Sequence, residues 1–122
     1  MKRVLVVDDS STTRALIAST VEDMEGFETI QAPNGFEALK LLPQQTFHLI
    51  ITDINMPDIN GLEIVHFVKK HPHYRTIPLI IVSTEGSDED IAKGLKLGAA
   101  AYVTKPFQPD VLQTTIRRVV TA

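Results

Sequence analysis

The sequence predicts a single α/β domain, residues 1–122, with a five-stranded parallel sheet and helices on both faces. Strand-like and helix-like segments alternate five times along the chain, which is typical of this class. Three strand segments are almost uninterrupted apolar runs, as expected for central strands covered on both faces, and two are mixed. With strands numbered along the chain, this favours the order 2-1-3-4-5 and a doubly wound topology.

Five strands are expected, at 3–8, 27–32, 47–53, 78–83 and 100–104. The first, third and fourth contain the apolar runs Val4–Val7, Leu49–Ile51 and Leu79–Val82. The second alternates apolar and polar residues from Phe27 to Ala32, which indicates an edge strand. The fifth is short and mixed, and is expected at the other edge.

Five helices are expected, at 10–25, 34–43, 60–70, 87–97 and 108–120. Gly26 is expected to end the first. Asn60 and Glu63 resemble a capping box at the start of the third. Ser87 can cap the fourth helix and Gly98 can end it.

The fourth helix also contains Gly94, which costs about 1 kcal/mol relative to Ala in a helix interior. Pro109 suits the first position of the last helix. Leu112, Ile116 and Val119 give that helix an apolar stripe.

The composition excludes several classes of function. A net charge of −3 argues against nucleic acid as the main partner. The chain has no cysteine, which excludes disulfides and zinc–thiolate sites and is compatible with a reducing cytoplasm. No signal-like start and no apolar run of about 20 residues is present, so we expect a cytoplasmic protein that does not insert into a membrane.

Polar residues follow four of the apolar runs: Asp8 and Asp9, Asp53, Ser83, and Lys105. Because the carboxyl ends of parallel strands meet at one edge of a sheet, we expect these side chains to face one another. At ~5 Å and an effective dielectric near 20, each pair of carboxylates repels by about 3 kcal/mol. Oxygen ligands without Cys or a nearby His predict Mg²⁺, with Mn²⁺ as an alternative.

Asp53 can also act as a nucleophile, because a carboxylate can accept a phosphoryl group as an acyl phosphate. Lys105 would supply a positive charge and Ser83 a hydroxyl donor. Each residue alone has a simpler interpretation: Asp8 and Asp9 as a turn or helix cap, Lys105 as a surface lysine, and Ser83 as a helix entry. Their joint placement at one edge favours the chemical interpretation.

These residues carry a resemblance to the receiver domains of bacterial two-component response regulators, and most to stand-alone CheY-like regulators. The resemblance covers essentially the whole chain, and its four motifs in order are highly specific. They are Val4–Ser10, Asp53–Gly61, Ile80–Ser83 and Gly98–Phe107.

The resemblance implies a flavodoxin-like fold and a role for each site residue. Asp53 would take the phosphoryl group from a phosphohistidine on a partner histidine kinase. Ser83 and Lys105 would bind the phosphoryl oxygens, Tyr102 would be an aromatic switch coupled to Ser83, and Lys105–Pro106 would be a cis peptide. Mg²⁺ would be held by Asp8 through water, by Asp9, by Asp53 and by the Asn55 backbone carbonyl.

Three further positions bear on the lifetime of the phosphorylated form. Asn55 and Glu85 flank the expected path of attacking water, as in the better-known chemotaxis regulators. After the position of Ser83 many receivers carry Ala or Gly, whereas this chain has the β-branched Thr84, whose bulk could narrow the entrance to the phosphorylated carboxylate. The two features could oppose each other, so the sequence assigns no lifetime.

The function we expect is a phosphorylation-activated switch rather than an enzyme, with self-phosphorylation from small donors and autodephosphorylation. With no output domain attached, it would act through an effector or motor protein, as in chemotaxis. The binding surface would be the fourth helix, fifth strand and fifth helix, where Gly94 and Gly98 would leave the fourth helix pliant. It includes Lys93, Lys96, Tyr102, Lys105 and Arg117.

Three alternatives remain at this point. A phosphate sink or phosphorelay intermediate would use the same site without an effector. A flavodoxin-like FMN binder would need donors in place of Asp8 and Asp9, which repel phosphate without metal. A phosphatase with an aspartyl nucleophile would commonly carry Asp-x-Asp after the first strand, where this chain has adjacent aspartates, and a cap domain.

Overall fold

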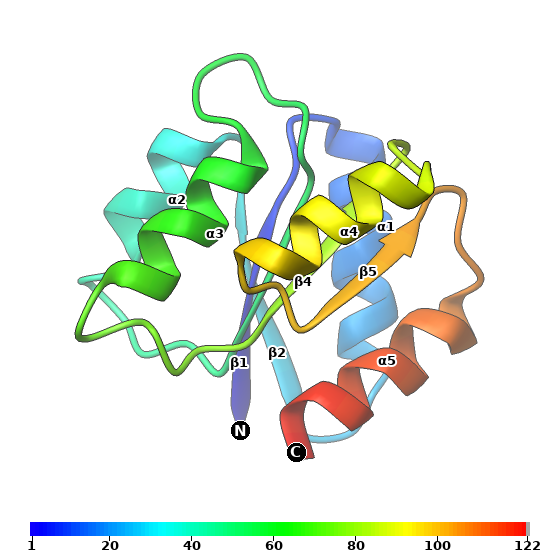
Figure 1. Cartoon of the computed structure of the whole chain (residues 1–122). Helices are drawn as coiled ribbons and strands as arrows, with labels where there is room; N and C mark the ends of the chain where they lie inside the picture. Colours follow the sequence, from blue (N-terminus) through cyan, green and yellow to red (C-terminus); the bar gives the residue numbers. More distant parts are fainter. Residues whose placement is uncertain (122) are drawn as a thin grey trace.

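The computed structural model describes residues 1–121 and contains one five-stranded parallel sheet of order β2-β1-β3-β4-β5 (Figure 1). The strands are β1 (Lys2–Val7), β2 (Phe27–Ala32), β3 (Leu49–Thr52), β4 (Leu79–Ser83) and β5 (Ala101–Thr104). The predicted fold class and strand order are therefore confirmed.

The burial of each strand agrees with its central or edge position in the sheet. Every residue of β3 and β4 is buried, and so are the last four of β1, because helices cover both faces of these strands. β2, predicted as an edge strand, is mostly half-buried. β3 begins two residues later than predicted: His48 donates its amide to the Arg3 carbonyl (2.8 Å) before the regular ladder starts.

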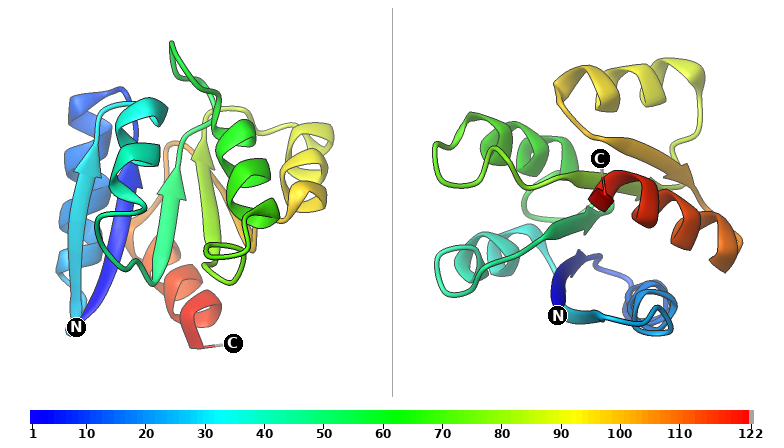
Figure 2. Two further views of the ribbon diagram at one scale, coloured as in Figure 1. Left: turned by 90° about the vertical axis from the view of Figure 1, so that its left-hand side faces the viewer. Right: turned by 90° about the horizontal axis from the view of Figure 1, so that it is seen from below.

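Five helices lie against the sheet in two layers (Figures 1 and 2). They are α1 (Ser11–Glu22), α2 (Gly35–Leu41), α3 (Gly61–Lys70), α4 (Asp88–Leu97) and α5 (Pro109–Thr121). α1 and α5 cover one face, where Ile17, Val21, Leu112 and Ile116 pack against Val6. α2, α3 and α4 cover the other, and each face has its own apolar core.

The helix signals in the sequence mostly hold. Asn60 and Glu63 form a capping box on α3, Ser87 caps α4, and Pro109 is the first residue of α5. Gly98 is the C-cap of α4, with φ +121°.

The end of α1 was predicted wrongly. The helix ends at Glu22, with Asp23 as its C-cap, and Gly26 lies beyond it in the turn before β2 with φ +87°. Gly26 therefore serves the entry into the strand rather than the helix end. α2 also ends earlier than predicted, at Leu41 and not at Pro43.

All strands run in the same direction, so the residues that follow β1, β3, β4 and β5 lie at one edge of the sheet (Figure 1). Over residues 1–121, the helices are too short or too polar for any of them to cross a bilayer.

Candidate functional site

Three aspartates meet at the edge where the strands end. Asp8 and Asp9 follow β1, and Asp53 follows β3, which pairs directly with β1. One carboxylate oxygen from each lies within 4.8 Å of the others. Asp8 is completely buried and Asp53 is 8% exposed, whereas Asp9 is exposed to solvent. The predicted acidic cluster is thus assembled, with one side open.

The Lys105 ammonium group lies between two of these carboxylates. Its Nζ is 2.8 Å from Asp8 Oδ2 and 3.2 Å from Asp53 Oδ2. Burial lowers the pKa of Lys105, but the hydrogen bond to Asp8 and the charge of Asp53 outweigh it, so the pKa is raised above its ordinary value. The peptide bond from Lys105 to Pro106 is cis, the form that the resemblance implies.

Backbone amides fix the orientation of the two buried carboxylates. Asp8 Oδ1 accepts from the Ser10 amide (2.9 Å), at the start of α1. Asp53 Oδ1 accepts from the Ile54 amide (2.7 Å). In each case the other oxygen, Oδ2, accepts a hydrogen bond from Lys105 Nζ, so both oxygens of each buried carboxylate are held by the protein.

Ser83 and Tyr102 both contact the segment between β4 and α4. Ser83 is buried, and its Oγ accepts from the Glu85 amide (3.1 Å). The Tyr102 hydroxyl donates to the Glu85 carbonyl oxygen, and the ring is half-buried. Burial raises the pKa of Tyr102. The ring packs against the apolar core, and Glu85 contacts both residues that are predicted to act as a switch.

Asn55 and Glu85 contact each other across the mouth of the site. Asn55 Nδ2 donates to Glu85 Oε1 at 2.6 Å, which links the loop after β3 to the loop after β4. Thr84 is exposed beside them, and lines a hollow of about 360 Å³ that also includes Lys105 and Phe107. Thr84 therefore borders the site on the side of Lys105.

Several residues that shape the site were missed from the sequence. Arg14 Nη1 donates to the Asp8 carbonyl oxygen (2.8 Å) from the first turn of α1. Gly61, the first residue of α3, touches the Asp53 backbone, since a Cβ there would lie 1.8 Å from the Asp53 carbonyl oxygen. Asp58 accepts hydrogen bonds from α2, across the loop.

A sequence signal existed only for Gly61, since a glycine at the start of a helix can mark a close approach of two backbone segments.

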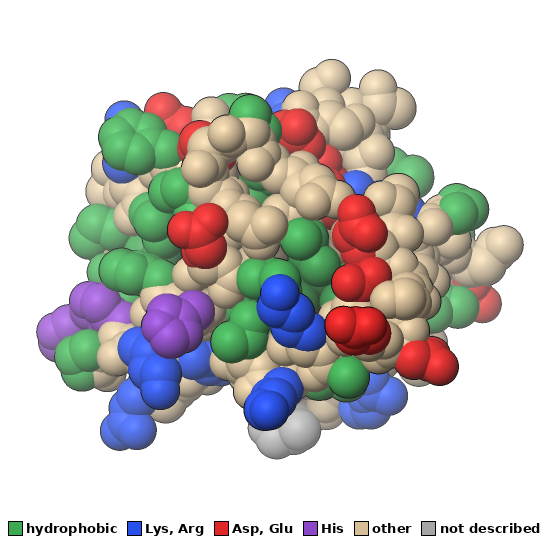
Figure 3. All heavy atoms as spheres, turned by 45° about the horizontal axis from the view of Figure 1, so that its top comes forward, with side chains coloured by type: hydrophobic (Ala, Val, Ile, Leu, Met, Phe, Trp, Pro, Cys, Tyr) green, Lys and Arg blue, Asp and Glu red, His purple; other side chains and the backbone are tan. Residues whose placement is uncertain are grey.

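The expected output surface meets the acidic cluster at Lys105. Lys93, Lys96 and Arg117 are exposed, on α4 and α5, whereas Tyr102 and Lys105 are half-buried. In Figure 3, which brings the edge with the site forward, acidic side chains lie mostly in the upper and right parts of the view. Histidines gather at lower left. The charge of this face is therefore unevenly distributed.

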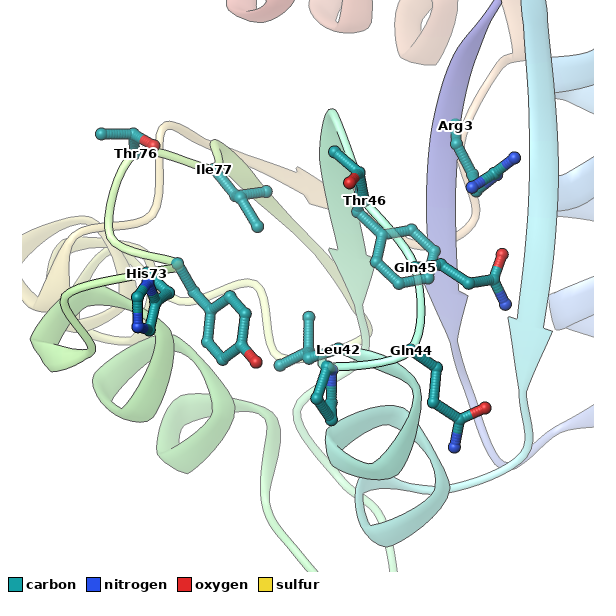
Figure 4. A pocket seen from close by; sticks show the side chains of 11 residues that line it. Arg3, Leu42, Gln44, Gln45, Thr46, His73, Thr76 and Ile77 are labelled. Carbon is teal, nitrogen blue, oxygen red and sulfur yellow. The ribbon is translucent and has the colours of Figure 1, made fainter.

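A hollow of about 720 Å³ lies at the opposite edge, where the strands begin (Figure 4). Its walls come from Arg3 and from the segments before β3 and β4, residues 42–47 and 73–77. It is open and lined by neutral amide, hydroxyl and aromatic groups beside Arg3 and His73. None of its lining residues is a carboxylate, so the acidic cluster is the better candidate for chemistry.

Comparison with known proteins agrees with the geometry. A family model described as "Response regulator receiver domain" matches residues 4–117. The CheY homolog, a chemotaxis protein of Campylobacter jejuni, is 40% identical over 118 residues, which cover 96% of this chain and 91% of that protein. Chemotaxis protein CheY1 of Helicobacter pylori is 39% identical over 112 residues, covering 91% and 90%. The structure of chemotaxis response regulator CheY4 of Vibrio cholerae aligns with a TM-score of 0.89 and 38% identity, over 98% of both chains.

Proposed function

Because the chain belongs to the response regulator receiver family, we propose that it is a phosphorylation-activated signalling switch. In this proposal Asp53 accepts a phosphoryl group from a phosphohistidine on a histidine kinase, and the change alters a surface that binds another protein. The observation that carries it is the juxtaposition of Asp53 with two more carboxylates and the Lys105 ammonium group.

Asp53 has the properties of a phosphoacceptor. A carboxylate oxygen of Asp53 attacks phosphorus, the bond from phosphorus to the donor nitrogen breaks, and that electron pair stays on the imidazole. The product is an acyl phosphate. Small donors such as acetyl phosphate meet the same nucleophile, and water later hydrolyses the acyl phosphate to the free Asp53 carboxylate and inorganic phosphate, so the protein is proposed to be a phosphoacceptor and not a turnover enzyme.

Lys105 and Ser83 are proposed to hold the new phosphoryl oxygens. The Lys105 ammonium already contacts Asp53 Oδ2, so a phosphoryl group attached there falls within its reach. Ser83 follows β4, the strand beside β3, and its hydroxyl can turn from the Glu85 amide to a phosphoryl oxygen. Each new bond joins a charged group and is stronger than a neutral hydrogen bond.

The donor set fits a hard divalent cation. Asp8, Asp9 and Asp53 supply oxygen atoms, and the Asn55 backbone carbonyl is proposed as a further ligand. The exposure of Asp9 leaves room for the waters that Mg²⁺ retains. When bound, Mg²⁺ (or Mn²⁺) would neutralise charge on the carboxylates and on the incoming phosphoryl oxygens.

The output surface is proposed to be α4, β5 and α5. When Ser83 turns toward the phosphoryl group it releases the Glu85 amide, and Glu85 also holds the Tyr102 hydroxyl. The rearrangement of this loop would then change how Tyr102 and α4 are presented. The exposed Lys93, Lys96 and Arg117 would contact an effector, and since the relatives are named chemotaxis proteins, we propose a motility effector such as a motor protein.

The lifetime of the phosphorylated form is proposed to depend on Asn55, Glu85 and Thr84. The hydrogen bond between Asn55 and Glu85 spans the solvent side of the site, and Thr84 adds bulk beside it. In this proposal Thr84 restricts the approach of water to the acyl phosphate, whereas Asn55 and Glu85 flank the path of that water, so the two features act on the lifetime in opposite directions.

Intact-mass spectrometry tests the proposed function. With acetyl phosphate and Mg²⁺, the protein should gain one phosphoryl group on Asp53. Asp53→Asn keeps the shape of the side chain but removes the anionic nucleophile, so it should gain none. Labelling that persists in Asp53→Asn, with the phosphate mapped to another residue, would overturn the assignment.

A further inference from the structure

The loop between β3 and α3, residues 54–60, carries Asn55. Its two ends lie next to each other beside the Asp53 backbone. The Gly61 amide donates to the Ile54 carbonyl oxygen (2.8 Å) and closes the base of the loop. Gly61 also touches the Asp53 backbone, because a Cβ at this position would lie 1.8 Å from the Asp53 carbonyl oxygen. The base is therefore rigid, and the position of the loop depends on what holds its far end.

Asp58 holds the far end against α2. Its Oδ2 accepts from the Phe36 amide (2.8 Å) and its Oδ1 from the Gly35 amide (3.3 Å). The Phe36 hydrogen bond is the main reason that the pKa of the Asp58 carboxyl is lowered. Asn34, the N-cap of α2, is bonded to the Glu37 amide instead, so Asp58 takes two amides that the helix's own cap leaves free.

A second contact at the same place is steric. A Cβ added to Gly35 would lie 2.7 Å from Ile59 Cβ and 3.0 Å from the Ile59 carbonyl oxygen. The loop thus approaches α2 so closely that only glycine fits. The hydrogen bonds of Asp58 and the contact of Ile59 with Gly35 both hold the loop close to the start of α2.

We propose that Asp58 and Gly35 are positioning residues for the metal site, because they fix the loop that presents the Asn55 carbonyl. This inference rests on the proposed function, which assigns that carbonyl to Mg²⁺. Asp58 does not touch the metal in this account; it acts through the loop. Partners that orient metal ligands typically change metal affinity by about 10- to 100-fold when they are removed.

The coupling runs in both directions. If the loop position favours Mg²⁺, then Mg²⁺ must favour the loop position, and with it the hydrogen bonds to Gly35 and Phe36. Mg²⁺ should therefore slow hydrogen exchange at these two amides, although they belong to a different element.

The test is an NMR titration of Mg²⁺ with wild type, Asp58→Asn and Gly35→Ala, together with amide exchange at positions 35 and 36. Gly35→Ala leaves every charge in place, so it separates loop position from electrostatics. Asp88→Asn is the matched charge control, because Asp88 is exposed at the start of α4, on the same edge of the sheet. Melting curves in EDTA establish that each variant is folded.

We expect Asp58→Asn and Gly35→Ala each to raise the Kd for Mg²⁺ about tenfold, and Asp88→Asn to leave it unchanged. In wild type alone, Mg²⁺ should slow exchange at both amides. Folded variants that bind Mg²⁺ with the wild-type Kd would overturn the inference and leave the proposed function standing. So would a loss in Asp58→Asn without one in Gly35→Ala, which would indicate charge alone. A wild type that binds no Mg²⁺ would instead contradict the proposed metal site itself.

Discussion

At the scale of single residues, Lys105 explains how two buried carboxylates can lie side by side. Asp8 is completely buried, and an unpaired buried charge is strongly destabilising. The Lys105 ammonium contacts both Asp8 and Asp53, and therefore serves as an internal counter-charge. The same group is proposed to bind the phosphoryl oxygens, so a stabilising role and a functional role fall on one side chain.

We expect Lys105→Ala to lower the free energy of unfolding in EDTA at pH 7, by on the order of 3 kcal/mol, because it leaves a buried carboxylate without its partner. The pKa of Lys105 is raised above its ordinary 10.5. Its pairing therefore contributes stability that is fully present below about pH 10.5 and lost as the pH rises through the folded-state pKa.

Urea unfolding of wild type and Lys105→Ala at pH 9 and pH 11 measures this contribution. The difference between the two proteins should shrink at pH 11. Tyr102, whose pKa is also raised, destabilises the fold in the same direction at alkaline pH, so Tyr102→Phe is the control that isolates Lys105. A difference that is equal at both pH values would refute the role of Lys105 as the counter-charge.

Some residues of the site could be predicted from the sequence and others could not. The acidic cluster and Lys105 follow apolar runs, and strand ends in a parallel sheet meet at one edge, so their proximity could be predicted. Arg14 and Asp58 could not, because each acts through a contact between elements that depends on side-chain orientation. Neither lies at a strand end.

At the scale of elements, α4 is joined to the site through Gly94 and Tyr102. We expected Gly94 to make the helix pliant, and the structure gives it a packing role. A Cβ on Gly94 would lie 2.8 Å from Ile81 Cδ1 and 3.1 Å from Tyr102 Cδ2. The missing side chain thus makes room for the inward ring of Tyr102.

Gly94→Ala should displace the Tyr102 ring from the Glu85 carbonyl oxygen. Overpacking costs about 1–3 kcal/mol, and better helix propensity returns about 1 kcal/mol, so stability should change little or fall. The ring resonances of Tyr102 and the free energy of unfolding report the two effects. In a Tyr102→Ala background the cost of Gly94→Ala should be smaller, as a double-mutant cycle would measure. Additive effects would mean that the two residues do not interact.

The elements themselves were largely predictable, and their ends less so. Caps such as Ser87 and the Asn60–Glu63 box depend on local chemistry, and these were correct. The end of α1 depends on how the chain turns into β2, where Met24 donates its amide to the Val21 carbonyl oxygen (3.0 Å) and stops the regular helix before Gly26. No single residue type signals that turn.

At the scale of the whole molecule, the acidic cluster should couple metal binding to folding. Mg²⁺ at 100 times its Kd stabilises the folded state by about 2.7 kcal/mol, which raises the Tm of a domain of this size by roughly 10 °C. Asp9→Ala should remove the gain by deleting a ligand. In EDTA the variant should melt no lower than wild type, because Asp9 is exposed and its loss relieves repulsion. Melting curves with and without Mg²⁺ check this, and an unchanged Tm of wild type in saturating metal would speak against a metal site.

The proposed switch depends on communication between the acidic cluster and the surface formed by α4, β5 and α5. Contacts run from Ser83 at the end of β4 through Glu85 and Tyr102 to Gly94 in α4. A phosphoryl group on Asp53 is proposed to act on this series through Ser83. To carry the population from 1:99 to 99:1, phosphorylation must favour the active form by about 5.5 kcal/mol, and a smaller bias gives a graded response.

The most direct measurement is a comparison of amide chemical shifts with and without beryllofluoride, a mimic of the phosphoryl group, in wild type and in Lys105→Ala. In wild type, shifts should extend from the acidic cluster to residues 91–104. In Lys105→Ala, binding at Asp53 should persist in part while the distant shifts are lost. If the wild-type shifts stay confined to the neighbourhood of Asp8, Asp9 and Asp53, the switch mechanism is wrong, even with Asp53 fully phosphorylated.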